Sequence, residues 1–125
     1  MKTKLLASLL LVASLFSQTQ GSVYFLGTSG LTTVQTVKAT PGELLGMHTL
    51  NSTAAVCFIQ FFNATAANVT LGTTIPWFVI GMVASNQNLQ FPAIRVPFST
   101  ALSIAATTTT SGSTTCAVNG AMYYH

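Results

Sequence analysis

The stretch AAVCFIQFF (residues 54–62) decides the fold, because both of its alternating faces are apolar. Side chains along a β-strand point alternately to opposite sides of the sheet. One face of this stretch carries Ala55, Cys57, Ile59 and Phe61, and the other carries Val56, Phe58, Gln60 and Phe62. A strand of this kind has to be covered on both sides. We expect the core of a sandwich on one side and, on the other, a neighbouring subunit.

Strand signals continue on both sides of this stretch, and no segment after residue 22 shows a convincing helical period. The other runs that read as strands are residues 23–26, 33–39, 44–50, 77–84, 89–91, 101–106 and 116–124, with a low-complexity loop at 107–115. Pro92 and Pro97 cannot donate to a ladder, so their segment should lie at a sheet edge or contain a bulge. The spacing predicts an all-β chain, an antiparallel β-sandwich or jelly-roll-like single domain.

One turn signal leaves two interpretations open. Asn119-Gly120 is a dipeptide typical of tight hairpins. Its flanking runs are short, so a continuous final strand fits the sequence at least as well.

The first 21 residues differ from the rest of the chain. Lys2 and Lys4 precede an apolar run of 12 residues (5–16), and a polar segment ending at Gly21 follows. This is the pattern of a secretory signal peptide, and the run is shorter than the about 18 residues of a transmembrane helix. The alternative is an uncleaved apolar helix that takes part in assembly. We therefore divide the chain into a leader (residues 1–21) and one β-sandwich domain (residues 22–125) without a membrane span.

Charge is scarce throughout, at 4% of the residues against about 25% in a typical soluble domain. Glu43 is the only acid, which argues against two-carboxylate hydrolysis and carboxylate-bound metals. Without the leader, Lys38 and Arg95 against Glu43 leave a net charge of +1 (two bases minus one acid). The high pI therefore reflects missing acids rather than a basic cluster, and we expect no nucleic-acid partner.

Few residues are available for catalysis. His48 and His125 are the only histidines, and Glu43 is the only carboxylate that could orient one of them. The chain contains the residues for a Cys57–His48 pair or a Ser–His48–Glu43 group, but no nucleophile motif supports either. The two histidines and two cysteines, at 48, 57, 116 and 125, lack the paired short spacing of a zinc site. We predict no enzyme activity, no catalytic or metal site and no cofactor.

Cys57 and Cys116 both fall in predicted strands. An even cysteine count in an exported chain permits a disulfide, and closing so long a loop could stabilise the fold by about 4 kcal/mol. Two buried thiols acting as small hydrophobic groups are the alternative, and both readings stay open. Three Asn-X-Thr triplets, at Asn51, Asn63 and Asn68, are attributed to chance in a chain so rich in Thr and Ser.

Several short sequence segments resemble those of the small β-sandwich structural proteins of tailed-phage virions, which are capsid- or tail-associated. They are VKATPGELLG (37–46), FNATAA (62–67), TIP (74–76), FP (91–92), FSTALSIAAT (98–107) and MYY (122–124). The resemblance covers residues 34–125 and rests on packing and turn phrases. The chain departs from the family in its missing Asp residues, its low charge and its leader.

The resemblance implies a non-enzymatic virion structural protein, a capsid decoration or other particle-surface subunit of a bacteriophage. Its partners would be other copies, in a homo-oligomer or array, and other virion structural proteins. The alternative is a secreted or periplasmic binding module or an extracellular filament subunit, in which Trp77, Tyr123 or Tyr124 stacks on a ligand such as a sugar. Against that alternative, we expect Trp77 in the core and the two tyrosines packed on a sheet face.

Overall fold

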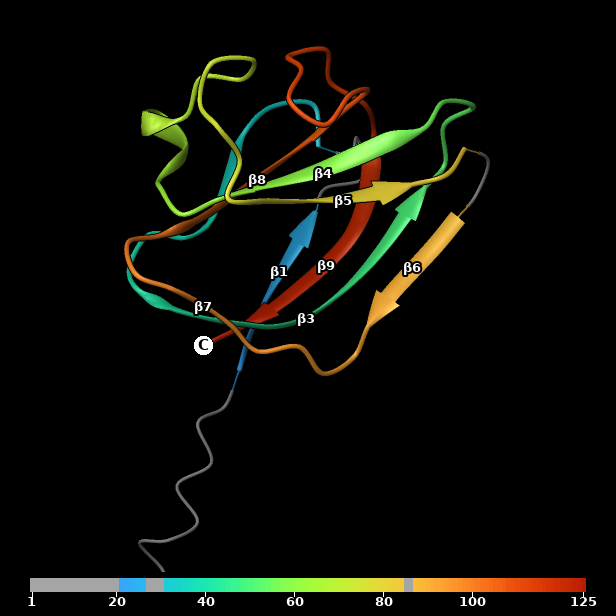
Figure 1. The fold of residues 1–125 in the computed structure, drawn as a ribbon. Helices are drawn as coiled ribbons and strands as arrows, with labels where there is room; N and C mark the ends of the chain where they lie inside the picture. The colour runs from blue at the N-terminus through green and yellow to red at the C-terminus, as the bar shows by residue number, and fades with distance from the viewer. Residues whose placement is uncertain (1–20, 27–30, 85–86) are drawn as a thin grey trace, which may run out of the picture.

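The β-branched and aromatic runs form nine strands in the part of the chain that the computed structural model describes, residues 21–26, 31–84 and 87–125 (Figure 1). The strands are β1 (Ser22–Leu26), β2 (Gln35–Lys38), β3 (Gly42–Asn51), β4 (Cys57–Phe62), β5 (Phe78–Met82), β6 (Gln87–Phe91), β7 (Val96–Phe98), β8 (Leu102–Thr107) and β9 (Val118–Tyr124). A short 3-10 helix, η2 (Ala66–Asn68), lies between β4 and β5. The predicted all-β fold is confirmed. Residues 1–20 of the predicted leader lie outside the described residues.

The strands are arranged in two antiparallel sheets. Sheet A has the order β1-β9-β3-β6, with β7 also pairing with β3, and sheet B has the order β2-β8-β4-β5. When β6 and β7 count as one interrupted strand, this is the strand order of a jelly roll, in which strands far apart in sequence are neighbours. β6 ends at Phe91, immediately before Pro92, and Pro97 of β7 lies opposite Glu43 of β3. The predicted edge position of the two prolines is confirmed.

The core lies between the two sheets. The face of β4 that carries Cys57, Ile59 and Phe61 is fully buried there, as the alternating pattern predicts. From sheet A, Leu44 and Met47 of β3 contribute to the same cluster. Burying side chains of this size contributes about 1.5–3 kcal/mol each, which makes this layer the main source of stability.

Part of the opposite face of sheet B is covered by the chain itself. Gln60 of β4 and Ser103 of β8 are fully buried on that face. Gln60 Nε2 donates to the carbonyl oxygen of Gly112 at 3.2 Å, and Ser103 Oγ donates to that of Ala64 at 2.6 Å. The loops before β5 and before β9 therefore fold over this face (Figure 1). At Gln60 and Ser103 the expectation that a neighbouring subunit covers this face is wrong, because two polar loops do so through hydrogen bonds, whereas Val56, just before β4, is 45% exposed.

β9 runs unbroken through Asn119 and Gly120, so the Asn-Gly pair forms no hairpin turn. Gly120 lies opposite Thr49 of β3 and has a φ of 144°, which side-chain-bearing residues rarely adopt. A Cβ atom at Gly120 would overlap the carbonyl oxygen of His48. Glycine is therefore required where the two central strands of sheet A approach each other.

We predict that Gly120→Ala lowers the free energy of unfolding by at least about 2 kcal/mol, because it adds backbone strain and a clash with the backbone of β3. Urea denaturation measures this loss. Gly81→Ala is the matched control, since a Cβ there would meet the Phe58 ring at 3.3 Å on the edge strand β5. Equal stability of the two variants would contradict the role assigned to Gly120.

Candidate functional site

The residues considered for catalysis do not come together. His48 lies on β3 between Ala121 of β9 and Gln90 of β6, and its side chain is on the outer face of sheet A. Glu43 lies five residues earlier on the same strand, about 16 Å away at roughly 3.3 Å per residue. Cys57 belongs to the other sheet and faces the core. Neither a Cys57–His48 pair nor a Ser–His48–Glu43 group is formed.

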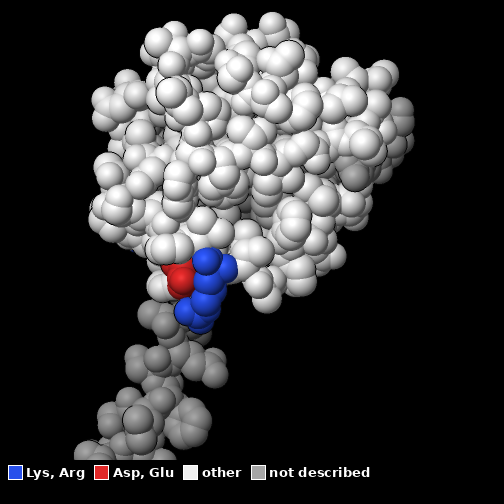
Figure 2. Space-filling view, viewed as in Figure 1, with Lys and Arg blue, Asp and Glu red and all other residues white. Residues whose placement is uncertain are grey.

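Glu43 instead belongs to a charged cluster at one end of the sandwich. Its Oε2 accepts a hydrogen bond from Arg95 Nη1 at 3.3 Å and lies 3.8 Å from Nε2 of His125. The Arg95 side chain is 78% exposed, so solvent screens this ion pair. Lys38 approaches Gly42 at the same end. Figure 2 shows charge in this one place, and the rest of the face in view carries none.

The described residues offer little for a cofactor. A shallow pocket of about 300 Å³ is lined by Leu45, Pro92, Ala93, Ile94 and Arg95, and its one ionisable side chain points largely into solvent. Within residues 21–26, 31–84 and 87–125, no three His, Cys, Asp or Glu side chains gather as a metal site requires. Over the same residues, no helix is both long enough and apolar enough to span a membrane.

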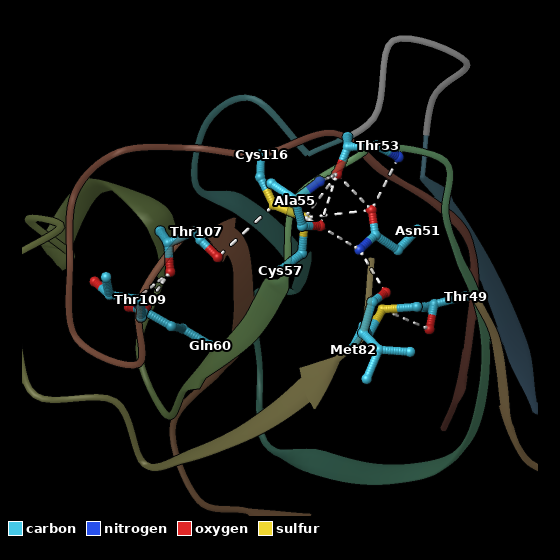
Figure 3. The surroundings of a disulfide bond; sticks show 11 residues. Thr49, Asn51, Thr53, Ala55, Cys57, Gln60, Met82, Thr107, Thr109 and Cys116 are labelled. Atoms are coloured by element: carbon cyan, nitrogen blue, oxygen red, sulfur yellow. Dashed lines mark hydrogen bonds between the residues drawn. A yellow bond between two sulfur atoms is a disulfide. The ribbon is translucent and has the colours of Figure 1, made fainter. Parts of the chain in front are cut away.

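Cys57 and Cys116 are joined by a disulfide, with their Cα atoms 6.1 Å apart (Figure 3). Cys57 begins β4 in sheet B, and Cys116 lies two residues before β9 of sheet A. The backbone N–H of Cys116 also donates to the carbonyl oxygen of Ala106 in β8, at 2.9 Å. The bond therefore attaches the segment that leads into β9 to the neighbouring sheet. In this state neither sulfur is a nucleophile.

Asn51 organises the turn beside the disulfide (Figure 3). It is the last residue of β3 and is fully buried. Its Nδ2 donates to the carbonyl oxygens of Ala55 and Val83, each at 2.9 Å. Its Oδ1 accepts from the backbone N–H and the hydroxyl of Thr53, at 3.0 and 2.7 Å. A side chain held in this way is structural and is not accessible for glycosylation.

Sequence reasoning treated Asn51 only as part of a chance Asn-X-Thr triplet. The signal that could have revealed its role is the position of an Asn at the end of a strand, two residues before a Thr. Asn side chains commonly bond the backbone two residues on and so build an Asx-turn.

The outer face of sheet A exposes large apolar side chains. Val23 and Phe25 of β1 are 43% and 75% exposed, and Tyr123 of β9 is 41% exposed. The ladder places these three on the face with Ala121, His48, Leu50, Asn88, Gln90 and Asn119. No member carries a permanent charge.

The other aromatic candidates take different positions. Trp77 is not in the core, contrary to the expectation, because it lies just before β5 and is 43% exposed. Its ring packs edge-on against Phe78, with the ring centroids 5.2 Å apart. Ile75, two residues earlier, is 88% exposed. Of the two tyrosines, Tyr123 lies on the outer face of sheet A, whereas Tyr124 packs against the core.

No protein-family model, no curated protein and no solved structure matches this chain. Its function has to be inferred from its own residues and geometry.

We predict that the disulfide forms in the purified protein, so that the unreduced intact mass lacks two hydrogens and alkylation after unfolding labels no thiol. Reduction should lower the free energy of unfolding by about 4 kcal/mol, since it releases a loop with a sequence separation of 59. The double variant Cys57→Ala/Cys116→Ala serves as control and should be insensitive to reductant. Two alkylatable thiols in unreduced protein would contradict the bond.

We also predict that Asn51→Ala lowers the free energy of unfolding by roughly 2–4 kcal/mol, because it leaves buried hydrogen-bonding groups of the turn without their partner. Chemical denaturation monitored by Trp77 fluorescence measures the loss. Asn68→Ala is the matched control: Asn68 is exposed and its Nδ2 makes one 3.2 Å bond to Thr65 Oγ1, so we expect a change below about 0.5 kcal/mol. A similar small effect of Asn51→Ala would refute the assignment.

Proposed function

We propose that this chain is a non-enzymatic structural subunit of a virion, a capsid decoration protein or other particle-surface component, that assembles through neutral β-sheet surfaces. The observation that carries the proposal is the contrast between the two outer faces. On sheet B the chain's own loops bury Gln60 and Ser103 and leave Val56 and Val83 exposed at one end, whereas sheet A exposes Val23, Phe25 and Tyr123 without any charge among them. Such a surface is suited to contact with protein.

The distribution of charge supports assembly rather than a solitary soluble domain. Lys38, Glu43 and Arg95 all lie at one end of the sandwich. A net charge near zero and a mostly uncharged surface give little protection against association. Contacts between copies would use apolar side chains and neutral Thr, Asn and Gln hydrogen bonds, as the resemblance to virion β-sandwich proteins implies.

The absence of catalysis remains part of the proposal. The support for it is that His48 and Glu43 are far apart on β3 and that both cysteines are bonded to each other. General acid–base or nucleophilic chemistry needs a base within hydrogen-bond reach of its partner, and these residues provide none.

Trp77 favours a second candidate, a secreted or periplasmic binding module or extracellular filament subunit. An exposed tryptophan beside an exposed aliphatic residue, here Ile75, is suited to stacking on a sugar. Trp77 is the only tryptophan of the chain, so its fluorescence reports on this site alone. Saturable quenching by oligosaccharides that is lost in Ile75→Ser would favour this candidate.

We predict that the protein self-associates in solution and is a stoichiometric component of purified virus particles. Sedimentation equilibrium of the disulfide-bonded protein, from about 10 μM to about 1 mM, tests the first part, and quantitative mass spectrometry of particles tests the second. A monomer over the whole range that is also absent from particles would overturn the proposal. Self-association without any particle would favour the filament form of the second candidate.

A further inference from the structure

The two edges of sheet A differ in how they are protected. Unpaired strand edges are templates for another strand, and proteins usually block them with prolines, charges or bulges. The edge formed by β6 and β7 contains Pro92 and Pro97, with the exposed Arg95 between them. The opposite edge, β1, has the sequence SVYFL, with neither a proline nor a charge. Among the described strands, β1 pairs with β9 alone.

The edges of sheet B are less suited to pairing with an added strand. β2 is four residues long, ends in Lys38 and has a register shift in its pairing with β8. β5 carries no charge, but its side chains are mostly half-buried or buried, and its exposed residue is Gly81. β1 is therefore the edge that combines an unprotected backbone with exposed apolar side chains.

The ladder shows which backbone groups of β1 face the free edge. Glu43 and His125 exchange both of their backbone hydrogen bonds, at 3.0 and 3.1 Å. Because such pairing alternates along an antiparallel strand, the odd-numbered residues of β9 direct their N–H and C=O groups toward β3. The even-numbered residues direct theirs toward β1, and the 3.1 Å bond from Leu31 N to the carbonyl oxygen of Val118 agrees with this.

The even-numbered residues of β9 lie opposite Ser22, Tyr24 and Leu26. These three residues of β1 therefore bond inward to β9. The N–H and C=O groups of Val23 and Phe25 point away from the sheet, and their side chains are 43% and 75% exposed. Backbone donors, backbone acceptors and apolar side chains suited to an added strand thus coincide at two residues.

We propose that β1 pairs antiparallel with β1 of a second copy of this chain, so that sheet A continues across a two-fold axis. Tyr24 would lie opposite Tyr24 of the other copy, and Val23 opposite Phe25. Within Ser22–Leu26, this is the register that pairs both outward-facing residues of each copy, so every outward N–H meets a C=O. This inference deepens the proposed function and rests on its self-assembly.

The chemistry of the edge favours a copy over a foreign partner. In this register the strand is self-complementary, since Val23 and Phe25 lie on the same face and would cover each other across the axis. The nearby Tyr123 extends the apolar contact. No charged side chain on β1 selects a charged ligand, and none repels a second copy. A single strand pairing buries less than the roughly 800 Å² per partner of a standard interface, so the association should be weak.

Amide hydrogen exchange of the unmodified protein tests the pairing directly. Between about 10 μM and about 1 mM protein, exchange at Val23 and Phe25 should slow several-fold, because these amides become bonded only in the pair. Tyr24, bonded to β9 in every state, and the amides of β5 should not change. If sedimentation shows association while Val23 and Phe25 exchange at an unchanged rate, the β1 pairing is overturned but the proposed function stands. A monomer at all concentrations overturns both.

Reciprocal charges test the register. Val23→Glu and Phe25→Lys should each weaken self-association roughly tenfold or more, because an unpaired charge is placed against an apolar side chain. An equimolar mixture should form heterodimers, since residue 23 of one copy faces residue 25 of the other. Ile75→Lys, in the loop before β5, is the control for surface charge and should associate like the unmodified protein. Thermal unfolding checks that each variant is folded.

A mixture that associates no better than the separate variants would overturn this register. Variants that associate as strongly as the unmodified protein would overturn the use of β1 and leave another surface as the contact.

Discussion

The insertion of β9 between β1 and β3 is the constraint on which the rest of the structure depends. Among the described strands, the last pairs with the first on one side and with the longest on the other. Sheet A is incomplete until this strand is in place, and β1 has no other partner among the described strands. Contacts of such large sequence separation are slow to form, because chain entropy is lost before they stabilise the fold. The Cys57–Cys116 disulfide holds the segment just before β9 against β4.

The requirement for Gly120 follows from the same insertion. β9 approaches β3 so closely at this residue that the carbonyl oxygen of His48 occupies the space of a side chain. Two of the polar groups buried in the fold lie on the other sheet, where Gln60 and Ser103 bind the covering loops. Loops thus cover part of one outer face through hydrogen bonds within the chain, and the other face is left with the exposed apolar side chains of Val23, Phe25 and Tyr123. This asymmetry is the basis for proposing that the chain assembles through sheet A.

Sequence reasoning succeeds where one local signal decides the outcome. The alternating apolar pattern of residues 54–62 locates β4, and the missing donors of Pro92 and Pro97 locate an edge. It fails at Trp77, because the local sequence pattern, a large aromatic residue before an apolar run, is the same whether that residue is buried or exposed. It also misses Asn51, whose partners include Val83, 32 residues further along the chain. No local pattern identifies a partner so distant.

The amino-acid sequence by itself determined the all-β fold class of this protein and its low content of charged residues, because side-chain alternation and ionisable residues can be read one position at a time. It also determined that few residues could support acid–base or metal chemistry. Only the tertiary structure decided which apolar face is covered and which is left open. Alternation defines two faces of a strand, but whether a face is buried depends on which distant segment lies over it. The tertiary structure places the loops over β4 and leaves β1 at the edge of sheet A.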